Sequence, residues 1–132
     1  MSVIHIETKS REEVVDITED VRKALNGKNG LAVVYTFHTT TGIMINEAEN
    51  GLLQDIMDRI SSLVPRNAGY RHDRIDSNAD AHIKASLVGN SVIIPVENGE
   101  LLLGTWQRIL FLEFDGPRRR RVYVRVYEAE ES

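Results

Sequence analysis

Residues 92–127 read VIIPVENGELLLGTWQRILFLEFDGPRRRRVYVRVY, and this stretch decides the fold. Val92–Val96 is a short apolar run rich in β-branched residues, which predicts a strand. Asn98-Gly99 follows it, and this pair favours the two-residue turn of a β-hairpin. Residues 101–114 predict a long strand or a bent pair of strands, with Gly104 as a candidate bulge. The stretch therefore begins as an antiparallel hairpin.

The second half of the stretch continues the same pattern. Asp115-Gly116-Pro117 predicts a turn, since glycine and proline are the strongest breakers of regular structure. Val122 to Tyr127 then alternates, with valines at 122, 124 and 126 and larger polar or aromatic side chains between them. This alternation is typical of a strand with one buried face. Successive strands joined by tight turns predict an antiparallel sheet.

Upstream of this stretch the patterns predict more strands and three helices. Strands are expected at Val3–Glu7, Leu31–Phe37 and Gly42–Asn46. A capping box at Ser10–Glu13 predicts a helix that ends at Asn26-Gly27. A second helix is expected at Ala48–Leu63, with Leu52, Leu53, Ile56, Ile60 and Leu63 inward, and a short third one from the capping box at Ser77–Asp80 to Gly89. We expect a single-domain α+β fold over residues 1–132: an antiparallel-rich, β-sandwich-like sheet with two or three helices.

Composition limits the classes of protein that this chain can be. Its 132 residues are 42% hydrophobic and 27% charged, as in ordinary globular domains. It has no cysteine, no apolar run long enough to cross a membrane, and no signal peptide at its start. We therefore expect a cytoplasmic protein without a membrane partner. The net charge of −4 argues against a nucleic-acid partner.

Two polar clusters stand out as candidate functional segments. Residues 66–89, RNAGYRHDRIDSNADAHIKASLVG, place two histidines, three aspartates and a lysine within thirteen residues. The second cluster, HTTTG, begins at His38 directly after an apolar run. Histidines and carboxylates at the ends of regular elements are the groups that a metal site or an acid/base site requires. If the fold brings the clusters together, they form a site.

His38, His72 and His82 are the candidate metal ligands. They match a catalytic zinc site in residue type, but no HExxH or HxH spacing is present. Two of them have a plain alternative, namely a bond to a loop carbonyl for His38 and solvent for His72, whereas His82 is one of the few large polar groups on its helix.

The other candidate catalytic residues also have two interpretations. Asp73 lies in a long polar loop, and Asp80 either caps the third helix or joins the site. Lys84 either serves catalysis or pairs with Asp80 one turn away. Glu47 is either a general base or a helix-start carboxylate. Gln107 follows the only tryptophan.

A further group of residues suits the binding of a phosphorylated or aromatic ligand. Thr39 and Thr40 offer hydroxyls, and Trp106 either stacks on a ring or belongs to the core. Arg119 and Arg120 lie in the run Arg118–Arg121, whose guanidinium groups suit phosphate oxygens. The alternative is an edge strand whose charge prevents aggregation.

Three separated motifs resemble the YjbQ family, whose members are known as secondary thiamine-phosphate synthase enzymes. They are HTTTGIMINE, GYRHDRIDSNADAHIKASLVG and SVIIPVENGELLLGTWQRILFLEFDGPRRRRV, and together they span most of the chain. The resemblance implies a β-sandwich-like α+β fold that assembles as a homotrimer with clefts near the subunit contacts. It also implies a site built from His38, Glu47, His72, Asp73, Asp80, His82, Lys84 and Gln107.

Three functions remain open from the sequence. The first is a transferase of the thiamine-phosphate synthase kind, in which cations such as Lys84, Arg119 and Arg120 stabilise a leaving pyrophosphate. The second is a metal-dependent hydrolase with a divalent metal, Zn or Mg, at the histidines. The third is a non-catalytic trimeric ligand-binding protein. In the first two, the partner is a small phosphorylated substrate.

Overall fold

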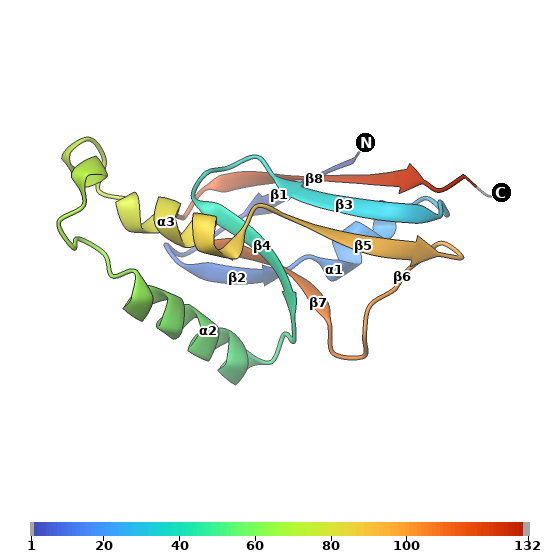
Figure 1. Cartoon of the computed structure of the whole chain (residues 1–132), viewed down its shortest axis with the longest axis horizontal. Helices are drawn as coiled ribbons and strands as arrows, with labels where there is room; N and C mark the ends of the chain where they lie inside the picture. Colours follow the sequence, from blue (N-terminus) through green and yellow to red (C-terminus); the bar gives the residue numbers. More distant parts are fainter. Residues whose placement is uncertain (1, 131–132) are drawn as a thin grey trace.

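A computed structural model describes residues 2–130 of the chain (Figure 1). In chain order the elements are β1 (Ser2–Glu7), β2 (Glu13–Asp16), α1 (Thr18–Lys23), β3 (Gly30–Thr36), β4 (Thr41–Asn46), α2 (Asn50–Leu63), the 3-10 helix η1 (Arg71–Arg74), α3 (Ala79–Val88), β5 (Ser91–Glu97), β6 (Glu100–Leu101), β7 (Arg108–Glu113) and β8 (Arg119–Glu128). None of the helices in this part of the chain is long and apolar enough to cross a membrane.

The strands form two antiparallel sheets. The larger sheet has the order β1-β8-β3-β5-β6, and the smaller one has the order β2-β7-β4. In the larger sheet β8 lies between β1, which pairs with residues 119–124, and β3, which pairs with residues 122–128. These sheets confirm the antiparallel-rich α+β fold expected from residues 92–127.

The core lies on both faces of the smaller sheet. One face of β7, with Ile109 and Phe111, packs against the inward valines and isoleucines of the larger sheet and against α1. Its other face, with Leu110 and Leu112, packs against α2 and α3. A strand buried on both faces has a continuous apolar sequence, which explains the run ILFLEF. The molecule thus has three layers: large sheet, small sheet and helices (Figure 1).

The predicted helix behind Ser10 is wrong over its first half. Residues 13–16 form β2, which pairs with β7, and only Thr18–Lys23 is helical. The Glu13 carboxylate does accept hydrogen bonds from the backbone N–H groups of Lys9 and Ser10, at 2.8 and 3.1 Å. These bonds close a turn rather than a helix. Val14 and Val15 are β-branched, and such residues are more stable in a strand paired with β7 than in a helix.

The other helices occur where they were expected, with shifted starts and contacts. Helix α2 begins at Asn50, and the carboxylate of Glu49 caps it. Its inward residues include Leu53, Met57 and Ile60, whereas Leu63, predicted to be inward, is 76% exposed. Helix α3 ends at Gly89 as predicted. At its start Asp73, not the expected capping box, accepts the Ala79 N–H at 3.0 Å.

The expected long strand at 101–114 is two strands in different sheets. Leu101 ends β6 in the larger sheet, and Arg108 begins β7 in the smaller one. Gly104 lies in the loop between them and is not a bulge. The alternative of a bent pair was therefore the correct one.

Candidate functional site

The HTTTG cluster is the connection between β3 and β4, and it lines a cavity of about 350 Å³. Hydroxyl groups, two aromatic rings and the backbone at the end of α3 complete the lining. The lining residues are Tyr35, Thr36, Phe37, His38, Thr39, Thr41, Ala85, Ser86, Gly89 and Asn90. Such a mixture of rings and a few polar groups is typical of a small-molecule site.

Glycine at 42 lets α3 close this cavity from one side. A Cβ at Gly42 would lie 2.7 Å from Cγ1 of Val88, and the N–H of Ile43 donates to the Gly89 carbonyl at 3.0 Å. The main chain at Gly42 therefore lies close against the end of α3.

His38 is held by the main chain of β8. The backbone N–H of Arg121 donates to Nε2 of His38 at 2.9 Å. Because Nε2 uses its lone pair as an acceptor, a neutral His38 carries its proton on Nδ1. Burial, and then the positive charges of Arg120 and Arg121, hold the pKa of His38 below its ordinary value of 6.5, while Glu113 opposes this shift. His38 is thus a neutral ring that offers Nδ1–H as a donor.

This geometry does not suit His38 as a metal ligand. Coordination through Nδ1 would require both ring nitrogens to give up their protons while Nε2 still accepted from Arg121. Within residues 2–130, no three histidine or carboxylate side chains gather closely enough to hold a metal ion. One chain therefore does not assemble the three-histidine site expected from His38, His72 and His82.

His72 and His82 pack against one another. Their ring centroids lie 4.8 Å apart in an edge-to-face arrangement. Asn78 donates through Nδ2 to Asp115 at 2.9 Å, so its Oδ1 accepts from Nε2 of His72 at 3.0 Å. His72 therefore carries its proton on Nε2 when neutral, and its Nδ1 keeps a lone pair. His82 lies one turn before Ser86 on α3, and the Ser86 hydroxyl donates to the His82 carbonyl at 2.9 Å. Ser86 lines the 350 Å³ cavity, but His82 does not.

Lys84 and Asp80 form a buried ion-pair network. Both residues are 1% exposed, and Nζ of Lys84 donates to Asp80 at 2.9 Å and to Glu12 at 3.0 Å. Arg11 adds a two-pronged bond to Asp80 at 3.1 and 3.2 Å. Burial alone would raise the pKa of Asp80, but the bonds from Arg11 and Lys84 outweigh it and lower that pKa.

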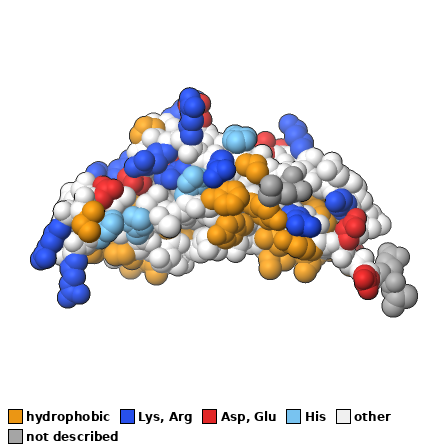
Figure 2. All heavy atoms as spheres, turned by 90° about the horizontal axis from the view of Figure 1, so that it is seen from above, with side chains coloured by type: hydrophobic (Ala, Val, Ile, Leu, Met, Phe, Trp, Pro, Cys, Tyr) orange, Lys and Arg blue, Asp and Glu red, His pale blue; other side chains and the backbone are white. Residues whose placement is uncertain are grey.

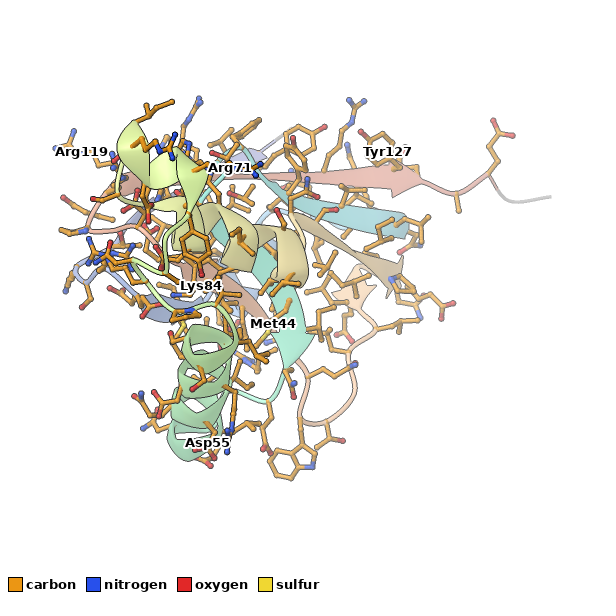
Figure 3. All side chains as sticks on the ribbon, turned by 60° about the vertical axis from the view of Figure 1, so that its left-hand side comes forward. Met44, Asp55, Arg71, Lys84, Arg119 and Tyr127 are labelled. Atoms are coloured by element: carbon orange, nitrogen blue, oxygen red, sulfur yellow. The ribbon has the colours of Figure 1, made fainter. Side chains whose placement is uncertain are left out.

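This network joins elements rather than binding a ligand. Ser61 of α2 donates to Glu12, so the network connects α2, α3 and the turn before β2. Figure 3 shows Lys84 in the interior between the helices. Because both charges of Lys84 and Asp80 are matched inside the protein, the catalytic or phosphate-binding role that we expected of Lys84 loses its physical basis.

Arg120 is likewise committed inside the protein. Its guanidinium makes bonds of 2.8 and 2.6 Å to Glu113, and it also donates to Thr40 at 2.9 Å. Arg120 is 5% exposed and Thr40 is 6% exposed. The structure therefore places these two predicted ligand-binding residues in the support of the site, whereas Thr39 lines the cavity.

Arg119 and Arg121 point to the outer face of the large sheet, because side chains alternate along β8. Among residues 2–130 neither one forms an ion pair within 4.0 Å. With His5 and Glu7 they line a hollow of about 520 Å³. The guanidinium of Arg121 lies 5.0 Å from the centre of the Phe37 ring, and that ring lines the cavity beside His38, whereas Arg121 itself lines the hollow.

The outer face of the large sheet also carries a group of exposed apolar side chains. Figure 2 shows this apolar patch next to a region where histidines lie among arginine and lysine side chains. The patch includes Leu31, Tyr35, Phe37, Ile93 and Tyr127, which are 38 to 61% exposed.

Three predicted site residues lie away from this region. Glu47 follows the far end of β4, and the six residues of that strand span roughly 20 Å. Trp106 and Gln107 lie in the loop between β6 and β7, which projects at the bottom of Figure 1, away from η1. Trp106 is 70% exposed, and the Gln107 side chain accepts from the N–H of Gly104 at 2.8 Å. The chain does not bring them to His38.

Two residues of the site were missed by the sequence interpretation. Arg121 was grouped with its neighbours, although the alternation of β8 already separates it from Arg120. Glu113 was read as part of an apolar strand. A lone carboxylate inside ILFLEF was an available signal, because such a group needs a buried cation as its partner.

Comparison with known proteins gives a consistent family. The model of the family described as "UPF0047 protein YjbQ-like" matches residues 2–129. A UPF0047 protein of Archaeoglobus fulgidus is 60% identical over 120 residues, which cover 91% of this chain and 95% of that protein. The UPF0047 protein YugU of Bacillus subtilis is 40% identical over 133 residues, covering 96% and 98%.

Solved structures agree with this relationship. The crystal structure of a hypothetical protein from Aeropyrum pernix has a TM-score of 0.93 and 42% identity, covering 97% of this chain and 98% of that one. A YbjQ-like protein of unknown function from Sulfolobus solfataricus has a TM-score of 0.94 and 36% identity, covering 97% and 96%. This chain therefore belongs to the YjbQ (UPF0047) family.

Proposed function

We propose that this protein is an enzyme that binds a small phosphorylated substrate beside His38 and transfers a group from it, as in thiamine-phosphate synthesis. The observation that carries the proposal is the setting of His38. Its Nδ1 has no hydrogen bond within residues 2–130, and the His38 ring lines a cavity together with hydroxyls and the rings of Tyr35 and Phe37. A neutral donor of this kind suits an anionic oxygen, and an aromatic wall suits a ring.

The proposed reaction displaces pyrophosphate from a hydroxymethylpyrimidine diphosphate by the ring nitrogen of a thiazole phosphate. Its transition state needs positive charge beside the leaving pyrophosphate. Arg121 and Arg119 can supply that charge, since neither is neutralised by a carboxylate among residues 2–130. Mg²⁺ carried by the substrate's phosphates would add to it. Arg121 thus takes the role that we first expected of Arg120 and Lys84.

The direct test is an assay of the purified protein with the two phosphorylated substrates and Mg²⁺, in which thiamine phosphate is quantified. His38→Ala and Arg121→Gln are expected to remove most of the activity. Arg125→Gln is the matched control, because Arg125 lies on the same strand and also stacks 5.0 Å from an aromatic ring, that of Tyr127. No product from the wild-type protein, or equal losses in all three variants, would contradict the proposal.

A second candidate function is hydrolysis of a phosphorylated compound, and the orientation of His72 favours it. The chain Asp115–Asn78–His72 holds the imidazole with Nδ1 unprotonated, as a general base requires. A divalent metal, Zn or Mg, would have to be held by groups other than His38. Phosphate release that depends on His72 and on added metal, but does not depend on a second substrate, would favour this function.

We also propose that the protein assembles as a homotrimer through the apolar patch on the large sheet, and that it acts in the cytoplasm. The patch combines the Tyr35, Phe37 and Tyr127 rings with Leu31 and Ile93, and aromatic side chains are enriched at protein interfaces. A non-catalytic trimer would keep this assembly but show neither turnover nor ligand binding in the assays above.

A further inference from the structure

Glu113 is a fully buried carboxylate that has all of its hydrogen-bonding capacity filled. It is 0% exposed. Its Oε1 accepts from Nε of Arg120 at 2.8 Å and from the Thr8 hydroxyl at 2.7 Å, and its Oε2 accepts from Arg120 at 2.6 Å and from the N–H of Asp115 at 3.1 Å. Four donors around two oxygens describe an ionised group in a fixed orientation.

Arg120 connects Glu113 to the loop that carries His38. One NH₂ group of its guanidinium donates both to Glu113 and to the hydroxyl of Thr40. The main chain of Thr40 is fixed as well, since its carbonyl accepts from the N–H of Phe114 at 3.1 Å. The loop is therefore tied to the end of β7 two residues away from His38.

The residue after Arg120 completes the arrangement. Arg121 donates its backbone N–H to Nε2 of His38, so two consecutive residues of β8 hold the loop, one by an inward guanidinium and the other by its main chain. We propose that Glu113 and Arg120 are positioning residues for His38, which fix its Nε2 on the Arg121 main chain and leave Nδ1–H for the ligand. The inference deepens the proposed function but concerns the free protein.

The charges around His38 are few, so the effect of this pair is measurable. Arg120 and Arg121 of β8 oppose protonation of His38, and Glu113 of β7 favours it. The residues of α3 and of the following turn that line the cavity, Ala85, Ser86, Gly89 and Asn90, carry no charge. Removing one member of the pair must therefore shift the titration of His38 in a direction set by the lost charge.

The experiment is an NMR titration of the histidine rings in the full-length protein without substrate. Glu113→Gln keeps the shape and removes the negative charge, so the midpoint of His38 should shift to lower pH. Arg120→Gln should shift it to higher pH and weaken the ring's hydrogen bond to Arg121. Glu12→Gln is the matched control, because it disturbs the other buried network and should leave the midpoint of His38 unchanged while still lowering thermal stability.

Unchanged His38 midpoints in folded Glu113→Gln and Arg120→Gln would overturn the inference, as would equal shifts in the Glu12→Gln control. If the first two variants do not fold, Thr40→Val replaces them. It removes only the hydroxyl that accepts from Arg120. The expected result is that His38 no longer holds the single Nδ1-protonated tautomer, as read from its ring nitrogen shifts, and an unchanged ring spectrum would overturn the inference. Because no substrate is present, this outcome is independent of the enzymatic assay.

Discussion

The N–H of Arg121 donates a 2.9 Å hydrogen bond to Nε2 of His38, which lies 83 residues earlier in the chain. This bond crosses from β8 to the connection between β3 and β4, and it determines which ring nitrogen can meet a ligand. It also brings the guanidinium of Arg121 over Phe37, and the Phe37 ring lines the cavity beside His38. The site is thus defined by one main-chain contact rather than by a cluster of histidines.

The first prediction concerns the pH dependence of stability. The folded-state pKa of His38 lies below its ordinary value of 6.5. Between those two values the unfolded chain binds more protons than the folded protein, so stability is lost as the pH falls through that window. His38→Gln, which can still accept from Arg121, should remove this component. Urea unfolding of both proteins between pH 7 and pH 5 measures it, and parallel curves would contradict the assignment.

The second prediction concerns the buried network of Asp80 and Lys84. Asp80→Asn should destabilise the protein by about 3 kcal/mol, because it leaves Lys84 and Arg11 without their shared carboxylate. The exposed Asp76→Asn is the control and should cost less than about 0.5 kcal/mol. Chemical unfolding at neutral pH gives both values.

The same carboxylate predicts part of the acid unfolding. The folded-state pKa of Asp80 lies below its ordinary value of 3.8, so its contribution is present above that value and is lost as the pH falls through the folded pKa. Asp80→Asn should therefore unfold with a weaker dependence on pH below about 4. An acid transition identical to that of the wild-type protein would show that Asp80 is not the linked group.

A third prediction tests the closure of the cavity by α3. Gly42→Ala should cost about 1–3 kcal/mol, since its Cβ would lie 2.7 Å from Val88. Val88→Ala removes the Cγ1 atom but keeps the Val88 Cβ, which would lie 2.9 Å from the new methyl group, so the double variant should recover only part of the loss. A double-mutant cycle measures this coupling. Additive effects would mean that the two residues are not in contact in solution.

A fourth prediction concerns assembly. Ile93 is 61% exposed on the outer face of the large sheet, and Ile93→Glu should convert the proposed trimer to smaller species. Leu63→Glu is the control, because Leu63 is 76% exposed on α2, away from that face. Light scattering coupled to size-exclusion chromatography distinguishes the two results. A wild-type monomer, or a trimer that survives Ile93→Glu, would remove the basis for this interface.

The fold could be predicted where local pattern and tertiary environment agree. Val122–Tyr127 alternates because one face of β8 is buried, and Gly89 ends α3 with a φ of 96°, a conformation that glycine adopts readily. Residues 13–16 could not be assigned, because the capping signal at Ser10 is local whereas the pairing with β7 joins residues almost 100 positions apart. Local propensity was overridden there by the sheet.

The site was predicted in its residue types more than in its arrangement. The sequence identifies His38, Thr39 and the 66–89 segment, but it does not reveal which charges neutralise one another. Lys84 and Arg120 look available as sequence and are buried against Asp80 and Glu113 in the fold. Arg121 and Arg120 are neighbours on β8, so their side chains point to opposite faces of the sheet, and only Arg121 is on the face open to a ligand.

The measurement that tests the central claim most directly is the binding of inorganic pyrophosphate to the wild-type protein and to single variants by isothermal titration calorimetry. We expect saturable binding that falls at least about tenfold in Arg121→Gln and in His38→Ala, in keeping with roughly 1.5–3 kcal/mol for a charge-assisted hydrogen bond. Arg125→Gln should bind as the wild-type protein does. Absence of binding to the wild-type protein, or equal weakening by Arg125→Gln, would contradict a phosphate site beside His38.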